Sequence, residues 1–200
     1  MIKSRTELLK LKEEIKFLKD GKAIFEEKRN ILLKEVMSIV DDIEKKRKEL
    51  NTKVLEGYKI LSKAIMEVGE EKLLKESSGK EKISLNVEEQ VFAGVVVPKV
   101  SFEFKKEVEI ERGEGIFSKL SEKIFREVVE LILEIAELEM KGWRIAEEIK
   151  KTTIRINAIE NFYLPNYKEQ AKKIEEELEE SERNSIALLK SWRSSEAPFV

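Results

Sequence analysis

Apolar residues recur along the first third of the chain at alternating steps of three and four residues. This spacing lines one face of an α-helix, and a run of about nine heptads without an internal turn signal indicates a coiled-coil helix rather than a helix of a globular core. The sequence therefore predicts one long helix with an apolar seam. The seam residues are Leu8, Leu11, Ile15, Leu18, Phe25, Leu32, Val36, Ile39, Ile43, Leu50, Val54, Leu61, Ile65 and Val68.

The second half of the chain repeats the pattern, with Pro165 as an interruption, and is predicted to supply the partner helix. Packing of the two seams gives the predicted fold class: an all-α dominated fold, a long antiparallel two-helix coiled coil with a small β-hairpin element between the helices. The second seam comprises Phe117, Leu120, Ile124, Val128, Leu131, Ile135, Leu138, Gly142, Ile145, Ile149, Thr152, Ile156, Ile159, Tyr163, Tyr167, Ala171, Ile174, Leu178, Ser181, Ser185, Leu188 and Trp192.

The segment between the two repeats has a different character. The breakers "ESSGKEK" and "ERGEGI" bracket it, and "KISLNVEE" and "VSFEFKKEVEI" alternate apolar and polar residues with period two, as strands with one solvated face do. We expect "VFAGVVVPKV" to join the strands, with Gly94 and Pro98 as loop or edge markers. The predicted organisation is a helix over 1–76, a β-hairpin element over 77–115, and a helix with a short tail over 116–200, forming one structural unit.

The composition argues against an enzyme. The chain has no Cys and no His, which excludes thiolate or imidazole metal ligands and nucleophile–base pairs built from these residues. No glycine-rich phosphate loop is present, and the acidic run Glu175–Glu182 lacks the Asp, Asn and Gly spacing of a calcium loop. A two-helix rod also offers little concave surface for paired catalytic carboxylates. We therefore predict a non-enzyme with no catalytic residue, metal or cofactor.

The charge balance argues against nucleic acid and membrane partners. The chain carries 39 basic and 41 acidic residues, whereas nucleic-acid binding domains are usually basic. No apolar run is long enough to span a membrane, and the first residues lack the apolar region of a signal peptide. We expect a cytoplasmic protein without membrane insertion. Three cations, Lys22, Arg29 and Lys46, fall on the first seam, where they need polar partners or help to fix the register.

Several stretches, in order along nearly the whole chain, resemble one known family. They are "SRTELLKLKEEIKFLKDGKAIFEEKRNILLKE", "VFAGVVVPKV", "RINAIENFYLPNYKEQ" and "LEESERNSIALLK", of which the "RINAIE" block followed by a proline is the most specific. The chain is similar to the D subunit of the archaeal/vacuolar-type (A/V-type) rotary ATPases and ATP synthases, the shaft of the central stalk. A non-rotary coiled-coil scaffold or adaptor is the alternative.

The resemblance implies a non-catalytic rotor shaft that transmits torque between the catalytic hexamer and the membrane ion-translocating ring. Its partners would be the catalytic A and nucleotide-binding B subunits, the small F subunit of the stalk, and the membrane-ring adaptor (the C/d subunit). The complex would be peripheral to the membrane on its cytoplasmic side. The hexamer-contact candidates are Arg5, Lys28, Arg29, Arg183 and Lys190, and the stalk-partner candidates are Val95, Val97 and Pro98. For each set, an ordinary structural role is the alternative.

Pro165 raises a separate question, because proline removes a hydrogen bond inside a helix. If the two helices pair antiparallel around the central segment, the numbers of facing residues add up to about 185–190. Pro165 then lies opposite residues 20–25, near Gly21, and Asn157 and Glu160 face the neighbourhood of Lys28 and Arg29. We predict a cross-helix site of Gly21, Asn157, Glu160 and Pro165, in which the missing side chain of Gly21 accommodates a kink and Glu160 reaches Arg29.

Overall fold

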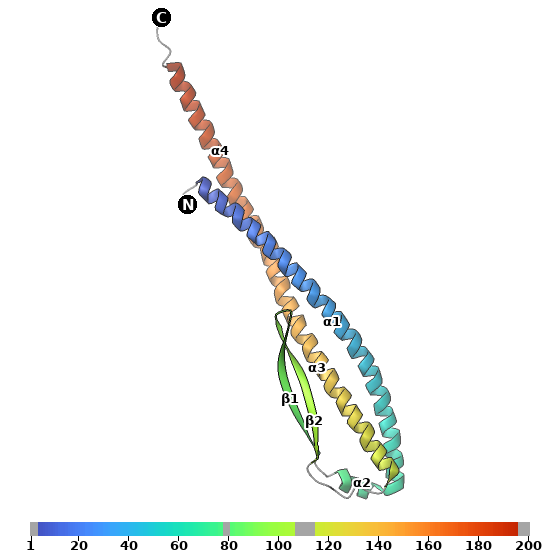
Figure 1. The fold of residues 1–200 in the computed structure, drawn as a ribbon. Helices are drawn as coiled ribbons and strands as arrows, with labels where there is room; N and C mark the ends of the chain where they lie inside the picture. The colour runs from blue at the N-terminus through green and yellow to red at the C-terminus, as the bar shows by residue number, and fades with distance from the viewer. Residues whose placement is uncertain (1–3, 78–80, 107–114, 196–200) are drawn as a thin grey trace. The chain divides into compact units, whose positions relative to one another are not determined.

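A computed structural model describes residues 4–77, 81–106 and 115–195, and long helices dominate it (Figure 1). The elements are α1 (Arg5–Val68), α2 (Glu70–Ser77), β1 (Glu81–Phe92), β2 (Val95–Lys106), α3 (Ile116–Ala158), a π-helical turn η1 (Ile159–Tyr163) and α4 (Leu164–Ser195). The two strands form one antiparallel hairpin. The predicted fold class, long paired helices with a small β-hairpin between them, is confirmed.

The chain forms two compact units. The terminal unit comprises residues 1–30 and 150–200, and the central unit comprises residues 31–149. The terminal core consists of Leu11, Ala171 and Ile174, flanked by Leu8, Ile15, Tyr167 and Leu178. The central core consists of Leu32, Ile39, Val95, Val97 and Ile145, flanked by Val36, Ile43, Phe92, Leu138 and Ile149. The helical members of both cores are predicted seam residues, so the apolar periodicity identifies the packed faces of the helices.

The seam prediction is wrong near the end of α4. Leu188 and Trp192 were expected to face the partner helix, but both are exposed. The reason is the position at which the partner begins: Arg5, the first residue of α1, already contacts Glu182. Beyond Glu182, α4 therefore continues without a described helix beside it, and its apolar side chains remain in contact with solvent.

The β-hairpin turns through Ala93 and Gly94, whose φ angles are 48° and 77°. Positive φ at both central residues is the signature of the two-residue turns that match the twist of a hairpin. The strands extend through most of the segment expected to join them, and Pro98 lies inside β2, paired with Glu89. Counted from the turn, this pair falls at a non-hydrogen-bonded position, so the proline nitrogen needs no partner there.

The end of α1 carries a stop signal that the sequence prediction omitted. α1 ends at Val68, because Gly69 adopts a left-handed conformation with φ of 92°, and α2 begins directly after it. Glycine after the last periodic residue is a common helix terminator. Glu67 at this end accepts hydrogen bonds from the backbone N–H groups of Ile116 (3.1 Å) and Phe117 (3.0 Å). The carboxylate thereby caps the first turn of α3.

We predict that Glu67→Ala lowers the free energy of unfolding by about 1 kcal/mol, because it leaves two helix N-terminal N–H groups without their acceptor. Urea unfolding followed by circular dichroism measures the change. Glu56→Ala is the matched control, since Glu56 is an exposed glutamate of the same helix. Equal effects of the two substitutions would show that the cap contributes nothing.

Candidate functional site

The described residues offer no evident reaction centre. Within residues 4–77, 81–106 and 115–195, no group of three or more acidic side chains is placed to hold a metal ion. Over the same residues, no helix is both long and apolar enough to cross a membrane. The features to weigh are therefore surfaces and contacts between elements: the ion pairs that join the helices, the β-hairpin, and the end of α4.

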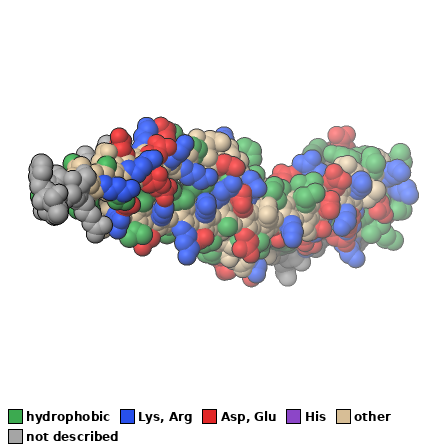
Figure 2. All heavy atoms as spheres, turned by 90° about the horizontal axis from the view of Figure 1, so that it is seen from above, with side chains coloured by type: hydrophobic (Ala, Val, Ile, Leu, Met, Phe, Trp, Pro, Cys, Tyr) green, Lys and Arg blue, Asp and Glu red, His purple; other side chains and the backbone are tan. Residues whose placement is uncertain are grey.

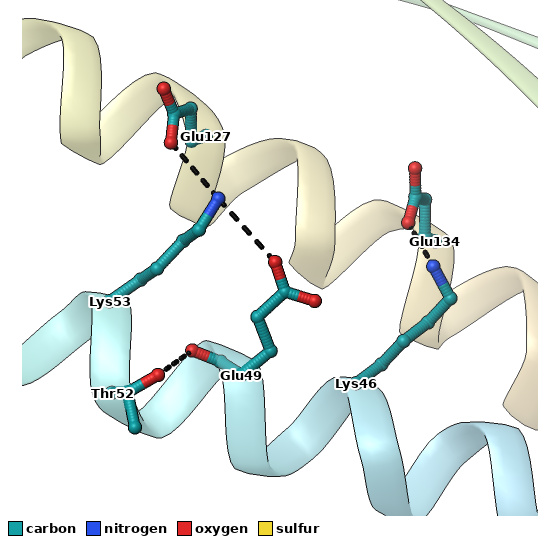
Figure 3. A network of polar contacts seen from close by, with 6 residues as sticks. All are labelled: Lys46, Glu49, Thr52, Lys53, Glu127 and Glu134. Carbon is teal, nitrogen blue, oxygen red and sulfur yellow. Dashed lines mark hydrogen bonds and ion pairs between the residues drawn. The ribbon is translucent and has the colours of Figure 1, made fainter.

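Cross-helix ion pairs line the central unit (Figure 3). Lys53 of α1 contacts Glu127 of α3 at 2.9 Å and its helical neighbour Glu49 at 3.5 Å. Lys46, one of the cations predicted on the seam, pairs with Glu134. The lysine stems lie along the apolar seam while their ammonium groups reach carboxylates at its border. The seam cation Lys46 therefore has its carboxylate partner on the opposite helix.

The pKa values of one pair are displaced in the directions expected for an ion pair. The hydrogen bond from Lys53 lowers the pKa of Glu127, and the same bond raises the pKa of Lys53 against a smaller opposing effect of burial. Both groups are therefore charged across the neutral range. A lowered carboxylate pKa in the folded state contributes stability above its unfolded value and loses it as the pH falls.

The terminal unit contains a second set of cross-helix pairs, each of which has its cation on α1. The pairs are Lys12–Glu175 (3.0 Å), Lys22–Glu160 (3.1 Å) and Arg5–Glu182. The hydrogen bond with Glu160 is the largest cause of the raised pKa of Lys22, which also contacts Glu26 at 3.6 Å. Lys22 is another cation at a predicted seam position. Like Lys46, it pairs with a carboxylate of the partner helix.

The residues of the predicted cross-helix kink lie differently from the expectation. Glu160 contacts Lys22, whereas Arg29 was the expected partner. A Cβ added at Gly21 would meet no other group within 4 Å, so the glycine leaves no space that another helix fills. Pro165 is accommodated within its own helix instead, because it is the second residue of α4, one residue after the π-helical turn η1. Asn157 is exposed on α3.

Two of the three hairpin candidates, Val95 and Val97, lie on the inner face of β2. Val95 and Val97 are 8% and 4% exposed and belong to the core formed with α1 and α3. Two further contacts attach the hairpin to α3: the N–H of Val100 donates to Glu137 Oε2 at 3.0 Å, and Lys141 Nζ lies 5.3 Å from the ring centroid of Phe92. β1 and β2 run beside α3 (Figure 1). The valines therefore fasten the hairpin, and Pro98 beside them is half-buried.

The exposed apolar side chains of the hairpin were not singled out from the sequence. Leu85 and Val87 of β1 are 54% and 60% exposed, and they continue toward the turn with Val91 and Val96. Cross-strand pairing places these residues on one face, since Val91 pairs with Val96. The period-two alternation in the sequence already indicates that these residues share one face of the hairpin. Which strand would lie against the helices was not readable from the alternation.

The last turns of α4 form another exposed surface. Its apolar members are Ile186, Leu188, Leu189 and Trp192. Arg183 and Lys190 lie on the same exposed stretch, and Arg183 contacts its neighbour Glu179. Of the other predicted hexamer contacts, Arg5 is engaged by Glu182, while Lys28 and Arg29 are half-buried. Charges of both signs are interspersed over the face seen in Figure 2, without a large patch of one sign.

Together these features define a class of protein: a helical pair, braced by ion pairs and carrying a β-hairpin, whose described residues present surfaces rather than a reaction centre. The sequence model of the ATP synthase D-subunit family matches residues 7–194. The V-type ATP synthase D subunit of Thermotoga neapolitana is 31% identical over 201 residues, covering 97% of each chain. The A-type ATP synthase D subunits of Thermococcus sibiricus and Methanosphaera stadtmanae are 35% and 33% identical, covering 94% of this chain and 90% of their own.

The chain therefore belongs to the ATP synthase D-subunit family. The family resemblance predicted from the sequence is confirmed, and so is the prediction of a non-catalytic subunit of a rotary ATP synthase complex. Membership covers both helical halves and the hairpin, because the matched residues include all of them.

The Lys53–Glu127 pair gives a pH-dependent prediction. Glu127→Gln lowers stability at pH 7, because the ammonium group loses its charged partner. The difference in the free energy of unfolding between the variant and the unsubstituted chain shrinks as the pH falls below the ordinary glutamate pKa of 4.5. It shrinks toward the lowered pKa of the folded state, because Glu127 itself becomes neutral there. Urea midpoints measured at several pH values test this. Glu44→Gln, at an exposed position of α1, is the control, and a constant difference for Glu127→Gln would contradict the assignment.

Proposed function

We propose that this chain is the central rotor shaft of an A/V-type ATP synthase, carrying torque between a catalytic hexamer and a membrane ion-translocating ring. The observation that carries the proposal is the family match, which extends over residues 7–194 and so includes every long helix and the hairpin. The scaffold or adaptor alternative has no comparable support. In this role the complex lies on the cytoplasmic side of the membrane, with the chain peripheral to it.

The proposed contact with the A and B subunits lies in the terminal unit. The end of α4 presents Arg183 and Lys190 together with the exposed apolar side chains of Ile186, Leu188 and Leu189. Exposed apolar groups of this kind mark surfaces that are buried in an assembly. Arg5, Lys28 and Arg29 are the further candidates on α1, and Arg5 would contact the hexamer while paired with Glu182.

The proposed contact with the small F subunit of the stalk lies in the central unit, on the exposed face of the hairpin. Leu85 and Val87 are the direct contacts in this proposal, because they are exposed, apolar and adjacent on one face of β1. Val95 and Val97 act indirectly, by holding β2 against the helices so that this face is presented. Pro98 remains a candidate for direct contact, because its cross-strand pairing puts it on the same face as Leu85 and Val87. The region of α2 and the start of α3 is assigned to the membrane-ring adaptor, the C/d subunit.

The hexamer contact can be tested with a truncation. Ending the chain after Glu182 keeps the terminal core residues but removes the exposed end of α4. We expect the full chain, together with the F subunit, to bind a purified A/B hexamer in one copy and to restore ATP-driven rotation. The truncated chain should keep its helical content but bind the hexamer at least about tenfold more weakly, a loss of roughly 1.4 kcal/mol.

Two outcomes contradict this part of the proposal differently. If the full, folded chain fails to bind a folded hexamer, the rotor role is wrong. If the full chain binds and the truncated chain binds equally well, the rotor role stands but the contact lies elsewhere than the end of α4.

The hairpin contact can be tested with aspartates on the two faces of one strand. The pair Leu85→Asp and Val87→Asp should weaken binding of the F subunit about tenfold, because it places charge on the proposed apolar contact. Ser84→Asp and Asn86→Asp, on the opposite and also exposed face of β1, form the control and should leave binding unchanged. Isothermal titration with the purified F subunit measures both. Equal effects of the two pairs would reject the assigned face.

A further inference from the structure

The π-helical turn η1, followed by Pro165, interrupts the α-helical backbone between α3 and α4. We propose that η1 is a built-in compliant turn: an extra residue inserted into the heptad pattern, fixed in position by Pro165, at which α4 can twist and bend against α1. Both the turn and the part of α1 beside it belong to the terminal unit.

The hydrogen bonds show how the turn is pinned. The N–H of Leu164 donates to the carbonyl of Ile159, five residues back, which is the π-helical pattern. The next residue, Pro165, has no N–H to continue either an α or a π ladder. A π turn shifted by one residue toward the C-terminus would need the N–H of residue 165 to close it. Proline has none, so the closing hydrogen bond stays at Leu164.

The burial pattern shows that the turn accommodates one extra residue. Ile156 and Leu164 are 2% and 9% exposed, and both face the interior of the helical pair although they are eight residues apart. Eight residues of α-helix overshoot a shared face by about 80°, whereas seven nearly match it. The wider π turn removes the overshoot. It also explains why the predicted seam residue Tyr163 is exposed and its neighbour Leu164 is buried instead.

The turn itself is weakly held. None of its five residues is buried, although buried residues lie on both sides of it. Phe162 and Tyr163 stack edge to face on each other, with ring centroids 5.3 Å apart, within the turn. The ion pair Lys22–Glu160 joins the turn to α1, and it is exchangeable, because Lys22 also has Glu26 within reach.

A helix segment with solvated hydrogen bonds and little burial opens at low free energy. Opening of η1 lets α4 twist or bend while the apolar contacts on both sides of the turn remain intact. The use of this compliance in a rotor rests on the proposed function. The compliance itself is a property of the chain alone, so it can be tested without the hexamer or the F subunit.

The experiment compares two single-residue deletions in the full chain carrying Pro165→Ala, which removes the block to a continuous helix. Deleting Asn161, an exposed residue of η1, restores the heptad spacing. Compared with the Pro165→Ala chain without a deletion, we expect this variant to have a Tm higher by a few degrees. Its amide exchange over residues 159–165 should be roughly tenfold slower, because helical hydrogen bonds are restored. Deleting Lys168, an exposed residue of α4, is the matched control and should lower Tm, because it rotates the core residues Ala171 and Ile174 out of the seam.

Hydrogen–deuterium exchange on the unsubstituted chain completes the test. The amides of residues 159–164 should exchange faster than those of the helical segments on both sides. The proposal is overturned if deletion of Asn161 lowers Tm as much as deletion of Lys168, since the turn would then be packed in place rather than inserted. It is equally overturned if the turn exchanges as slowly as its flanks. Neither result depends on whether the chain turns in a hexamer.

Discussion

The apolar seam between antiparallel helices is the constraint on which the rest of the structure depends. A helix of 64 residues with a strongly charged surface gains its stability from a packed face rather than from intrinsic propensity. The seam supplies that face in both units, with cores around Leu32, Ile39 and Ile145 and around Leu11, Ala171 and Ile174. The hairpin adds to this contact, and the cross-helix ion pairs repair interruptions in it.

The interruptions are repaired by charge. Lys22 and Lys46 take the place of apolar side chains on the seam, and each reaches a carboxylate on the opposite helix. An unpaired ammonium group at either of these half-buried positions costs more free energy than the ion pair contributes. The pairs therefore favour one register of the two helices over the neighbouring registers. The same logic explains Lys53 and Glu127, where both pKa values move in the direction that keeps the pair charged.

The hairpin depends on the seam in another way. A two-stranded sheet is marginal on its own in water. Val95 and Val97 extend the central core onto β2, and Glu137 accepts a hydrogen bond from the N–H of Val100. The inner strand is thereby used for attachment. β1 is left exposed, and its apolar face becomes the surface of the hairpin that is available for contact.

The sequence predicts the fold closely where a pattern is local and repeated. Steps of three and four residues identify the helical faces, and alternation identifies the strands, because each pattern recurs many times. Structural features that depend on a single residue are not predicted by these patterns. Gly69 ends α1 through one left-handed φ angle, and one residue inserted before Pro165 exchanges Tyr163 for Leu164 in the core. The candidate site was harder to predict, because the sequence does not distinguish a valine that packs against the helices from a valine that is exposed for contact with a partner. Only the packing of β2 against the helices shows that Val95 and Val97 face inward.

The internal pairing of charges also bears on the proposed rotor role. A shaft meets successive neighbours during rotation, and a surface with a strong field of one sign would bind one of them in preference to the others. Here several cations of α1 pair with carboxylates of the C-terminal helices, as in Lys12–Glu175 and Lys53–Glu127, and the formal net charge is only −2. The pairs that hold the helices in register therefore also neutralise the surface. Stability along the helical pair and weak, even interaction with its surroundings follow from the same residues.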